Sequence, residues 1–179
     1  GVVVEDEVRA AMVEFAPRLE IVSAERIRDE LLKLLATDRP ATGIRLLVDT
    51  GLADLFLPEL SELRATQDDH GRHKDVYEHS LTVLEQAIEL EIARRTDTDA
   101  GPDLVLRLAA LLHDIGKPST RKFERGGVTF HHHDLVGAKL ARKRLRALRL
   151  DNETIASVAR LIELHLRFFG YSDQQWTDS

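Results

Sequence analysis

The sequence contains no cysteine. A disulfide framework and a zinc site made of thiolates are therefore excluded, and any bound metal must use nitrogen and oxygen ligands. Aromatic residues are also scarce, at 5% of the chain, while hydrophobic residues make up 43% of its 179 positions. This composition favours helices, and the apolar share is sufficient for one ordinary core or two small helical modules.

Long apolar runs are absent as well. No stretch is long enough to cross a bilayer, and the first residues lack the basic and then apolar layout of a signal peptide. We therefore expect a cytoplasmic protein without a membrane partner. There is no excess of positive charge either, because 25 Lys and Arg face 31 Asp and Glu, for a net charge of -6. A generally basic, nucleic-acid-binding surface is not expected.

One segment departs from this acidic average. Between positions 139 and 149 the chain carries six basic residues, which are Lys139, Arg142, Lys143, Arg144, Arg146 and Arg149. They can form the solvated face of a helix or a stripe that contacts phosphate groups. Charge counting leaves both interpretations open.

Apolar residues recur at helical spacing along most of the chain, which predicts an all-α fold. Ser23, Gly51 and Asp151 are suited to cap helix ends. Residues 121–130 are the only candidate for strands, as a small hairpin that turns at two adjacent glycines. The expected helices cover residues 5–16, 24–36, 38–50, 75–95, 102–112 (opened by Pro102), 134–148 and 151–165, with short helical turns on both sides of Pro58.

Residues 113–117 read HDIGK and close a nearly unbroken apolar stretch. An adjacent His and Asp at the end of a buried helix suggest a metal site, because a buried carboxylate is costly unless a cation or hydrogen bonds compensate it. Gly116 permits a close approach of the backbone, and Lys117 is placed to meet an anionic substrate group. Imidazole and carboxylate suit a borderline first-row divalent cation, and two such cations can activate water against phosphorus.

Further histidines lie where such a site can recruit them. His79 falls on the apolar face of the helix expected from residue 75, and His165 continues the apolar stripe of the last helix. Residues 131–133 are three consecutive histidines after the hairpin, and any of them could be a ligand. A single histidine on an apolar face is more often a hydrogen-bonded core residue. Several such coincidences beside Asp114 nevertheless favour a metal centre.

These motifs resemble the HD superfamily of metal-dependent phosphohydrolases and, within it, the bacterial CCA-adding tRNA nucleotidyltransferases and related poly(A) polymerases. The resemblance covers nearly the whole chain. It rests on residues 21–31, which are similar to the neck of that family, and on residues 51–60, 72–80, 113–118 (HDIGKP) and 133–138 (HDLVGA). The last of these resembles the family's H-E-x-x-G-A segment, with Asp134 in place of Glu. This register selects His133 over His131 and His132.

The resemblance implies a neck-like helical segment over residues 1–65 and an HD domain over residues 66–179, built as a helical bundle with one small β-hairpin. It also implies one or two divalent metals (Mg, Mn, Ni, Co or Fe), held by His79, His113, Asp114, His133 and His165. In that scheme Asp114 positions a bridging water and Lys117 neutralises the substrate phosphate.

The chain also departs from the family. Nucleotidyl transfer resides there in an N-terminal head with a GGxVRD segment and paired aspartates, and neither feature is present. HD proteins usually complete their first metal with a distal Asp, which in this family would lie beyond Ser179. Asp173 and Asp178 stand in polar, loop-like surroundings and are not assigned as that ligand. We therefore interpret the sequence as a neck plus a C-terminally truncated HD domain, with a site that is assembled but weakly occupied.

The leading hypothesis is a parent protein that adds nucleotides to tRNA 3′ ends and binds those nucleotides through the head. Its HD domain then hydrolyses phosphate esters, including 2′,3′-cyclic phosphates, and Lys139, Arg142, Lys143 and Arg146 contact RNA. Two alternatives stay open. The HD domain can be a non-catalytic RNA-binding or structural module, or the protein can be a free-standing HD nucleotide phosphohydrolase, against which the neck-like helices argue.

Overall fold

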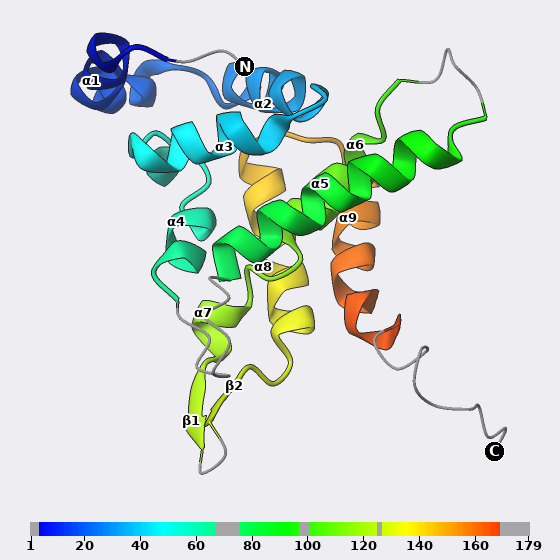
Figure 1. Cartoon of the computed structure of the whole chain (residues 1–179). Coiled ribbons are helices and arrows are strands. Elements are labelled where there is room, and N and C mark those ends of the chain that lie inside the picture. The colour runs from blue at the N-terminus through cyan, green and yellow to red at the C-terminus, as the bar shows by residue number, and fades with distance from the viewer. Residues whose placement is uncertain (1–3, 67–75, 97–100, 125–126, 169–179) are drawn as a thin grey trace, which may run out of the picture.

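The computed structural model describes residues 4–66, 76–96, 101–124 and 127–168 (Figure 1). The fold is almost entirely helical with a single two-stranded hairpin, as predicted. The elements are α1 (Asp6–Phe15), the 3-10 helix η1 (Ala16–Ile21), α2 (Ala24–Leu35), α3 (Pro40–Asp49), η2 (Ala53–Leu55), α4 (Glu59–Arg64), α5 (Val76–Arg94), α6 (Leu104–Leu112), α7 (Lys117–Thr120), β1 (Lys122–Glu124), β2 (Gly127–Thr129), α8 (His133–Ala147), α9 (Asn152–Leu164) and η3 (His165–Phe168).

The predicted caps are present. Ser23 Oγ accepts a hydrogen bond from the Arg26 amide at 3.4 Å, and Asp151 Oδ1 accepts one from the Thr154 amide at 2.8 Å. Each bond satisfies an amide that the first turn of a helix leaves without a partner. Gly51 follows α3 with a φ of +74°, a left-handed conformation that glycine adopts at little cost.

One predicted boundary is wrong. Pro102 does not open a helix, because α6 begins at Leu104 and Asp103 is its N-cap. The Asp103 carboxylate accepts a hydrogen bond from the Leu106 amide at 2.9 Å. A capping carboxylate satisfies an amide of the first turn, and here this interaction sets where the helix starts.

One hydrophobic core extends from the neck-like helices into the rest of the chain. It includes Leu31 and Leu35 of α2, Leu84 of α5, Leu111 of α6 and Ile162 of α9. The central helix α6 packs against α2, α5 and α9, and α5 crosses this group diagonally (Figure 1). The core therefore fixes the end of α6, where the HDIGK string begins. The expected domain boundary near residue 65 stays a prediction, since it adjoins residues 67–75, which lie outside the described ranges.

Two elements project from this core. The hairpin pairs β1 with β2 in antiparallel register, with Phe123 opposite Val128, and it extends beyond α7 and α8 (Figure 1). At the other end, α1 contributes no buried residue, and its apolar side chains Val8, Val13 and Phe15 are exposed. Within the described ranges, none of the helices has the length and apolarity that a membrane crossing requires.

Candidate metal centre

Asp114 lies in the turn between α6 and α7 and is almost completely buried, with 1% of its surface exposed. A close contact between two glycines brings α8 to this turn. A Cβ atom on Gly116 would lie 2.1 Å from the His133 carbonyl oxygen and 2.6 Å from the Gly137 amide nitrogen. Only glycine therefore permits this approach, as predicted, and the approach places His133 beside Asp114.

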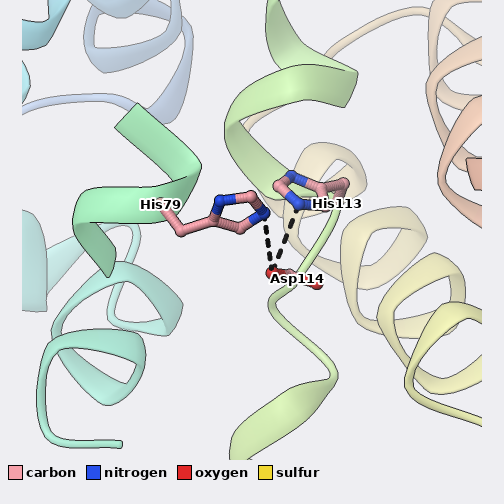
Figure 2. Close-up of side chains that lie close together, drawn as sticks. All are labelled: His79, His113 and Asp114. Atoms are coloured by element: carbon pink, nitrogen blue, oxygen red, sulfur yellow. Dashed lines mark ion pairs between the residues drawn. The ribbon is translucent and has the colours of Figure 1, made fainter. Parts of the chain in front are cut away.

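Four imidazoles converge on the Asp114 carboxylate. His113 Nε2 lies 3.2 Å and His79 Nε2 lies 3.9 Å from Oδ2, and Figure 2 shows these two rings reaching the same oxygen from α5 and from the end of α6. On the other side, His133 Nε2 lies 3.3 Å and His165 Nε2 lies 3.9 Å from Oδ1. The predicted convergence is confirmed. The potential ligand atoms form two triads that share Asp114, with the atoms of each triad within 4.8 Å of one another.

The main chain fixes the orientation of three of these rings. Nδ1 of His113 lies 2.8 Å from the Ala110 carbonyl oxygen, and His133 and His165 repeat this contact with the carbonyl three residues earlier, at 2.8 and 2.6 Å. A carbonyl oxygen only accepts, so each Nδ1 carries the proton. Each ring therefore presents its second nitrogen, Nε2, toward Asp114. Metal-binding histidines have the same arrangement, because the Nδ1 hydrogen bond orients the ring and leaves Nε2 to the metal.

His133 Nε2 and His165 Nε2 lie only 3.2 Å apart, and both face Asp114 Oδ1. A proton or a metal cation must therefore lie among these potential acceptor atoms. Burial lowers the pKa of His165 and so disfavours its imidazolium. The donor set and its geometry fit a divalent cation held by nitrogen and oxygen ligands.

Lys117 supplies one positive charge at the site. Its Nζ lies 2.8 Å from Asp114 Oδ2, although this oxygen makes no well-aligned hydrogen bond within the described residues. Burial raises the pKa of the Asp114 carboxyl. The contacts with His113 and His133 and the charge of Lys117 outweigh burial and hold that pKa well below its usual range. Asp114 is therefore ionised and available to cations on both oxygens.

Two other histidines and two C-terminal aspartates were also considered from the sequence. His131 and His132 are exposed and belong to neither triad, so the geometry agrees with the choice of His133. Asp173 and Asp178 lie outside the described residues.

The basic segment separates into two groups. Lys139, Arg142, Lys143 and Arg146 share one face of α8 at helical spacing, and none of them pairs with an acidic side chain in the described ranges. Arg144 points elsewhere, because its Nε donates to both carboxylate oxygens of Glu59 at 2.9 Å.

A second cluster of buried charge is formed by Arg107 and Glu91, and it was not predicted from the sequence. Arg107 Nε donates to Glu91 Oε2 at 2.8 Å, and its Nη1 donates to the carbonyl oxygens of Leu35 and Thr37. The available signal was a single arginine inside the apolar stretch of residues 104–112, since a buried arginine requires partners.

Comparisons with known proteins agree with this architecture. A model of the HD domain family matches residues 76–176, and a model described as the probable RNA and SrmB-binding site of polymerase A matches residues 1–63. An A-adding tRNA nucleotidyltransferase of Deinococcus radiodurans is 41% identical over 153 residues, covering 84% of this chain and 33% of that protein. A CC-adding tRNA nucleotidyltransferase of Thermus thermophilus is 38% identical over 146 residues, covering 79% and 31%.

More distant relatives carry a broader name. A multifunctional CCA protein of Vibrio parahaemolyticus is 31% identical over 137 residues, covering 75% of this chain and 31% of that protein. The chain thus spans about a third of the length of these curated relatives. Taken with the two matching models, these similarities show that the chain belongs to the HD domain family, in the branch that occurs in tRNA nucleotidyltransferases and poly(A) polymerases.

Proposed function

We propose that this chain is part of an enzyme that adds nucleotides to tRNA 3′ ends. We further propose that its HD part is a metal-dependent phosphohydrolase acting on phosphate esters, including 2′,3′-cyclic phosphates. The similarity to tRNA nucleotidyltransferases supports the first proposal. The second rests on one observation, the two triads that meet at Asp114 with the Nε2 atoms of three oriented imidazoles.

The residues then have distinct roles. His79 and His113 with Asp114 Oδ2 would hold one divalent cation, and His133 and His165 with Asp114 Oδ1 a second. Bound cations would supply Lewis-acid activation of water and of a phosphoryl oxygen. Asp114 links the two triads and orients water by accepting a hydrogen bond.

Lys117 contributes charge toward the substrate. Its ammonium lies 2.8 Å from Asp114 Oδ2 and compensates the charge of this carboxylate. Because cations in the triads would take over this compensation, Lys117 Nζ becomes available to a non-bridging phosphate oxygen, which is the role expected from the sequence.

The test of hydrolysis compares this chain with its Asp114→Asn and His133→Ala variants on adenosine 2′,3′-cyclic phosphate, with Mn, Ni, Co, Fe or Mg added separately. We expect hydrolysis that requires one of these metals and is lost in both variants, while Phe123→Ala, which removes an exposed side chain outside both triads, retains it. Hydrolysis without metal, or in Asp114→Asn, contradicts the proposal. The same preparation should incorporate neither CTP nor ATP into tRNA, because the paired aspartates of nucleotidyl transfer are absent.

We also propose that Lys139, Arg142, Lys143 and Arg146 of α8, which pair with no acidic side chain among the described residues, contact the phosphate backbone of tRNA. Their support is the shared face without acidic partners. Changing Arg142, Lys143 and Arg146 to Ala should weaken tRNA binding and flatten its dependence on salt, since fewer counterions are released. The charge-matched control changes three exposed cations elsewhere, Lys33, Arg94 and Arg160. If the two triple variants weaken tRNA binding equally, the basic face of α8 is ordinary solvated surface.

A further inference from the structure

A pocket of about 420 Å³ lies beside the histidine and aspartate cluster. One wall comes from β2 and the residues that connect it to α8, and the others come from α7 and η3. Its lining includes Lys117, Thr129, Phe130, His132, His133 and Leu166. The volume falls within the range of sites for small molecules.

The pocket and the proposed metal centre are neighbours that share His133. Lys117 contacts both, because its Nζ lies 2.8 Å from Asp114 Oδ2 and 5.6 Å from the centre of the Phe130 ring. A molecule in the pocket can therefore contact Phe130 and Leu166 while its phosphate group approaches Lys117.

The lining offers two different kinds of contact. Phe130 and Leu166 give apolar surface, and an aromatic face can stack on a planar ring. Lys117 supplies positive charge, and α8 begins beside the pocket without a side-chain cap, which adds the favourable potential of a helix N-terminus for anions.

The backbone at the pocket is held in an uncommon conformation. His132 has a φ of +63°, in the left-handed region that non-glycine residues enter at a cost. This residue separates the pocket residue Phe130 from the cluster residue His133. The strain is maintained where the chain turns from the hairpin into α8, and such outliers concentrate at ligand-binding sites.

We propose that this pocket binds the nucleoside part of a nucleoside phosphate, with the base on Phe130 and the phosphate directed toward Lys117 and the cluster. The inference rests on the proposed phosphohydrolase function and names the part of the substrate that the site selects. It assigns recognition to Phe130, which the two triads do not use.

The test measures equilibrium binding by the intact chain, without metal and with Mn²⁺, of adenosine 3′-phosphate and of its two parts, inorganic phosphate and adenosine. Phe130→Ala should weaken binding of adenosine 3′-phosphate about tenfold, since one stacked base contributes about 1–3 kcal/mol and 1.4 kcal/mol is tenfold. Binding of inorganic phosphate should not change. The Phe130 carbonyl that orients His133 is retained in this variant, and Phe130→Leu keeps apolar volume if the smaller side chain destabilises the fold.

The hairpin provides a matched control. Phe123→Ala removes an exposed aromatic ring from the same hairpin, outside the pocket lining, and should leave all three affinities unchanged. A short single-stranded RNA with a 3′-phosphate distinguishes the sources of the ligand. If it shows the same dependence on Phe130, the ligand is an RNA end, and if only the mononucleotide does, the ligand is a free nucleotide.

Three results overturn the inference. In the first, adenosine 3′-phosphate binds no more tightly than inorganic phosphate to the wild type. In the others, Phe130→Ala and Phe130→Leu leave the affinities for adenosine 3′-phosphate and inorganic phosphate unchanged, or they weaken these two affinities equally. The proposed function fails separately. Binding that depends on Phe130 without metal-dependent hydrolysis removes the phosphohydrolase assignment and leaves the subsite. Hydrolysis that is indifferent to Phe130 and to the nucleoside retains the assignment and removes the subsite.

Discussion

Helices α5 and α6 carry two clusters of buried charge, one centred on Arg107 and the other on Asp114. Arg107 is paired on every side, because Glu91 accepts from its Nε and Nη2 and the carbonyl oxygens of Leu35 and Thr37 accept from its Nη1. The two carbonyls lie at the end of α2, where a helix leaves acceptors without partners. This cluster therefore closes the joint between the neck-like helices and the rest of the fold.

The Asp114 cluster has the opposite balance. Its carboxylate faces four imidazole nitrogens, and the Nδ1–H groups of three of these rings donate hydrogen bonds to carbonyl oxygens. Lys117 is the only lysine or arginine in contact with Asp114 among the described residues. An added cation should therefore stabilise the Asp114 cluster, whereas it should not stabilise the Arg107 cluster.

The difference separates a structural cluster from a functional one. Both are buried and charged, so burial alone does not distinguish them. The distinguishing feature is whether donors and acceptors match within the protein. The nitrogen donors of Arg107 all have acceptors, in Glu91 and in two carbonyl groups. Asp114 and its imidazoles instead present potential ligand atoms that suit an added cation.

The largest expected effect is the loss of stability when Arg107 is removed from its cluster. Arg107→Ala leaves Glu91 and two carbonyls buried without their partner, and should lower the free energy of unfolding by about 3–5 kcal/mol. Urea denaturation measures this change. Arg95→Ala provides the control, because Arg95 also contacts Glu91, at 2.6 Å, but is more exposed, and its loss should cost at most about 1 kcal/mol. Equal losses in both variants would contradict the structural role assigned to Arg107.

The second effect is stabilisation of the Asp114 cluster by metal. A divalent cation at about 100 times its dissociation constant should raise the free energy of unfolding by about 2.7 kcal/mol, because it binds the folded state alone. Thermal unfolding with and without Mn²⁺ measures the shift. His133→Ala should reduce it, while His131→Ala, which removes an exposed neighbour outside both triads, should not. A shift that survives Asp114→Asn would place the metal elsewhere.

The third effect concerns the glycine contact that assembles the cluster. Gly116→Ala forces its Cβ atom against the backbone of α8, so overpacking should cost about 1–3 kcal/mol. The same displacement moves His133 away from Asp114, and metal should then stabilise the variant less than the wild type. Gly101→Ala is the matched control, because no atom lies within 4 Å of its added Cβ. Full metal stabilisation of Gly116→Ala would show that the contact does not position the ligands.

Local chemistry made much of this structure predictable from sequence. Ser23 and Asp151 cap helices because their side chains satisfy amides close to them in the chain. The HDIGK string places a carboxylate after an apolar helix, and its glycine indicated the close backbone approach. The choice of His133 depended on a family resemblance, since three consecutive histidines are equivalent by spacing alone.

Contacts between distant segments were not predictable in the same way. Arg144 lies in a basic run, yet it pairs with Glu59, 85 positions away. Arg107 reaches the Leu35 carbonyl across 72 positions. Such pairs follow from how helices pack, which periodicity does not specify. The Pro102 error has a local cause, because the neighbouring Asp103 supplies a cap that competes with proline for the helix start.

The smallest expected effect is a pH dependence confined to the matched cluster. Burial raises the pKa of Glu91, but hydrogen bonds from Arg107, the Asp103 amide and Arg95 outweigh burial and hold that pKa below its usual range. A carboxyl with a lowered pKa in the folded state stabilises the protein above its unfolded pKa of about 4.3, and this stability is lost as pH falls toward the folded value. Urea unfolding of wild type and Glu91→Gln at pH 7, 5, 4 and 3.5, without metal, should therefore show a difference that shrinks below about pH 5. Both proteins retain Asp114, so its titration cancels in the comparison, and two parallel pH profiles would mean that Glu91 contributes no charge-dependent stability.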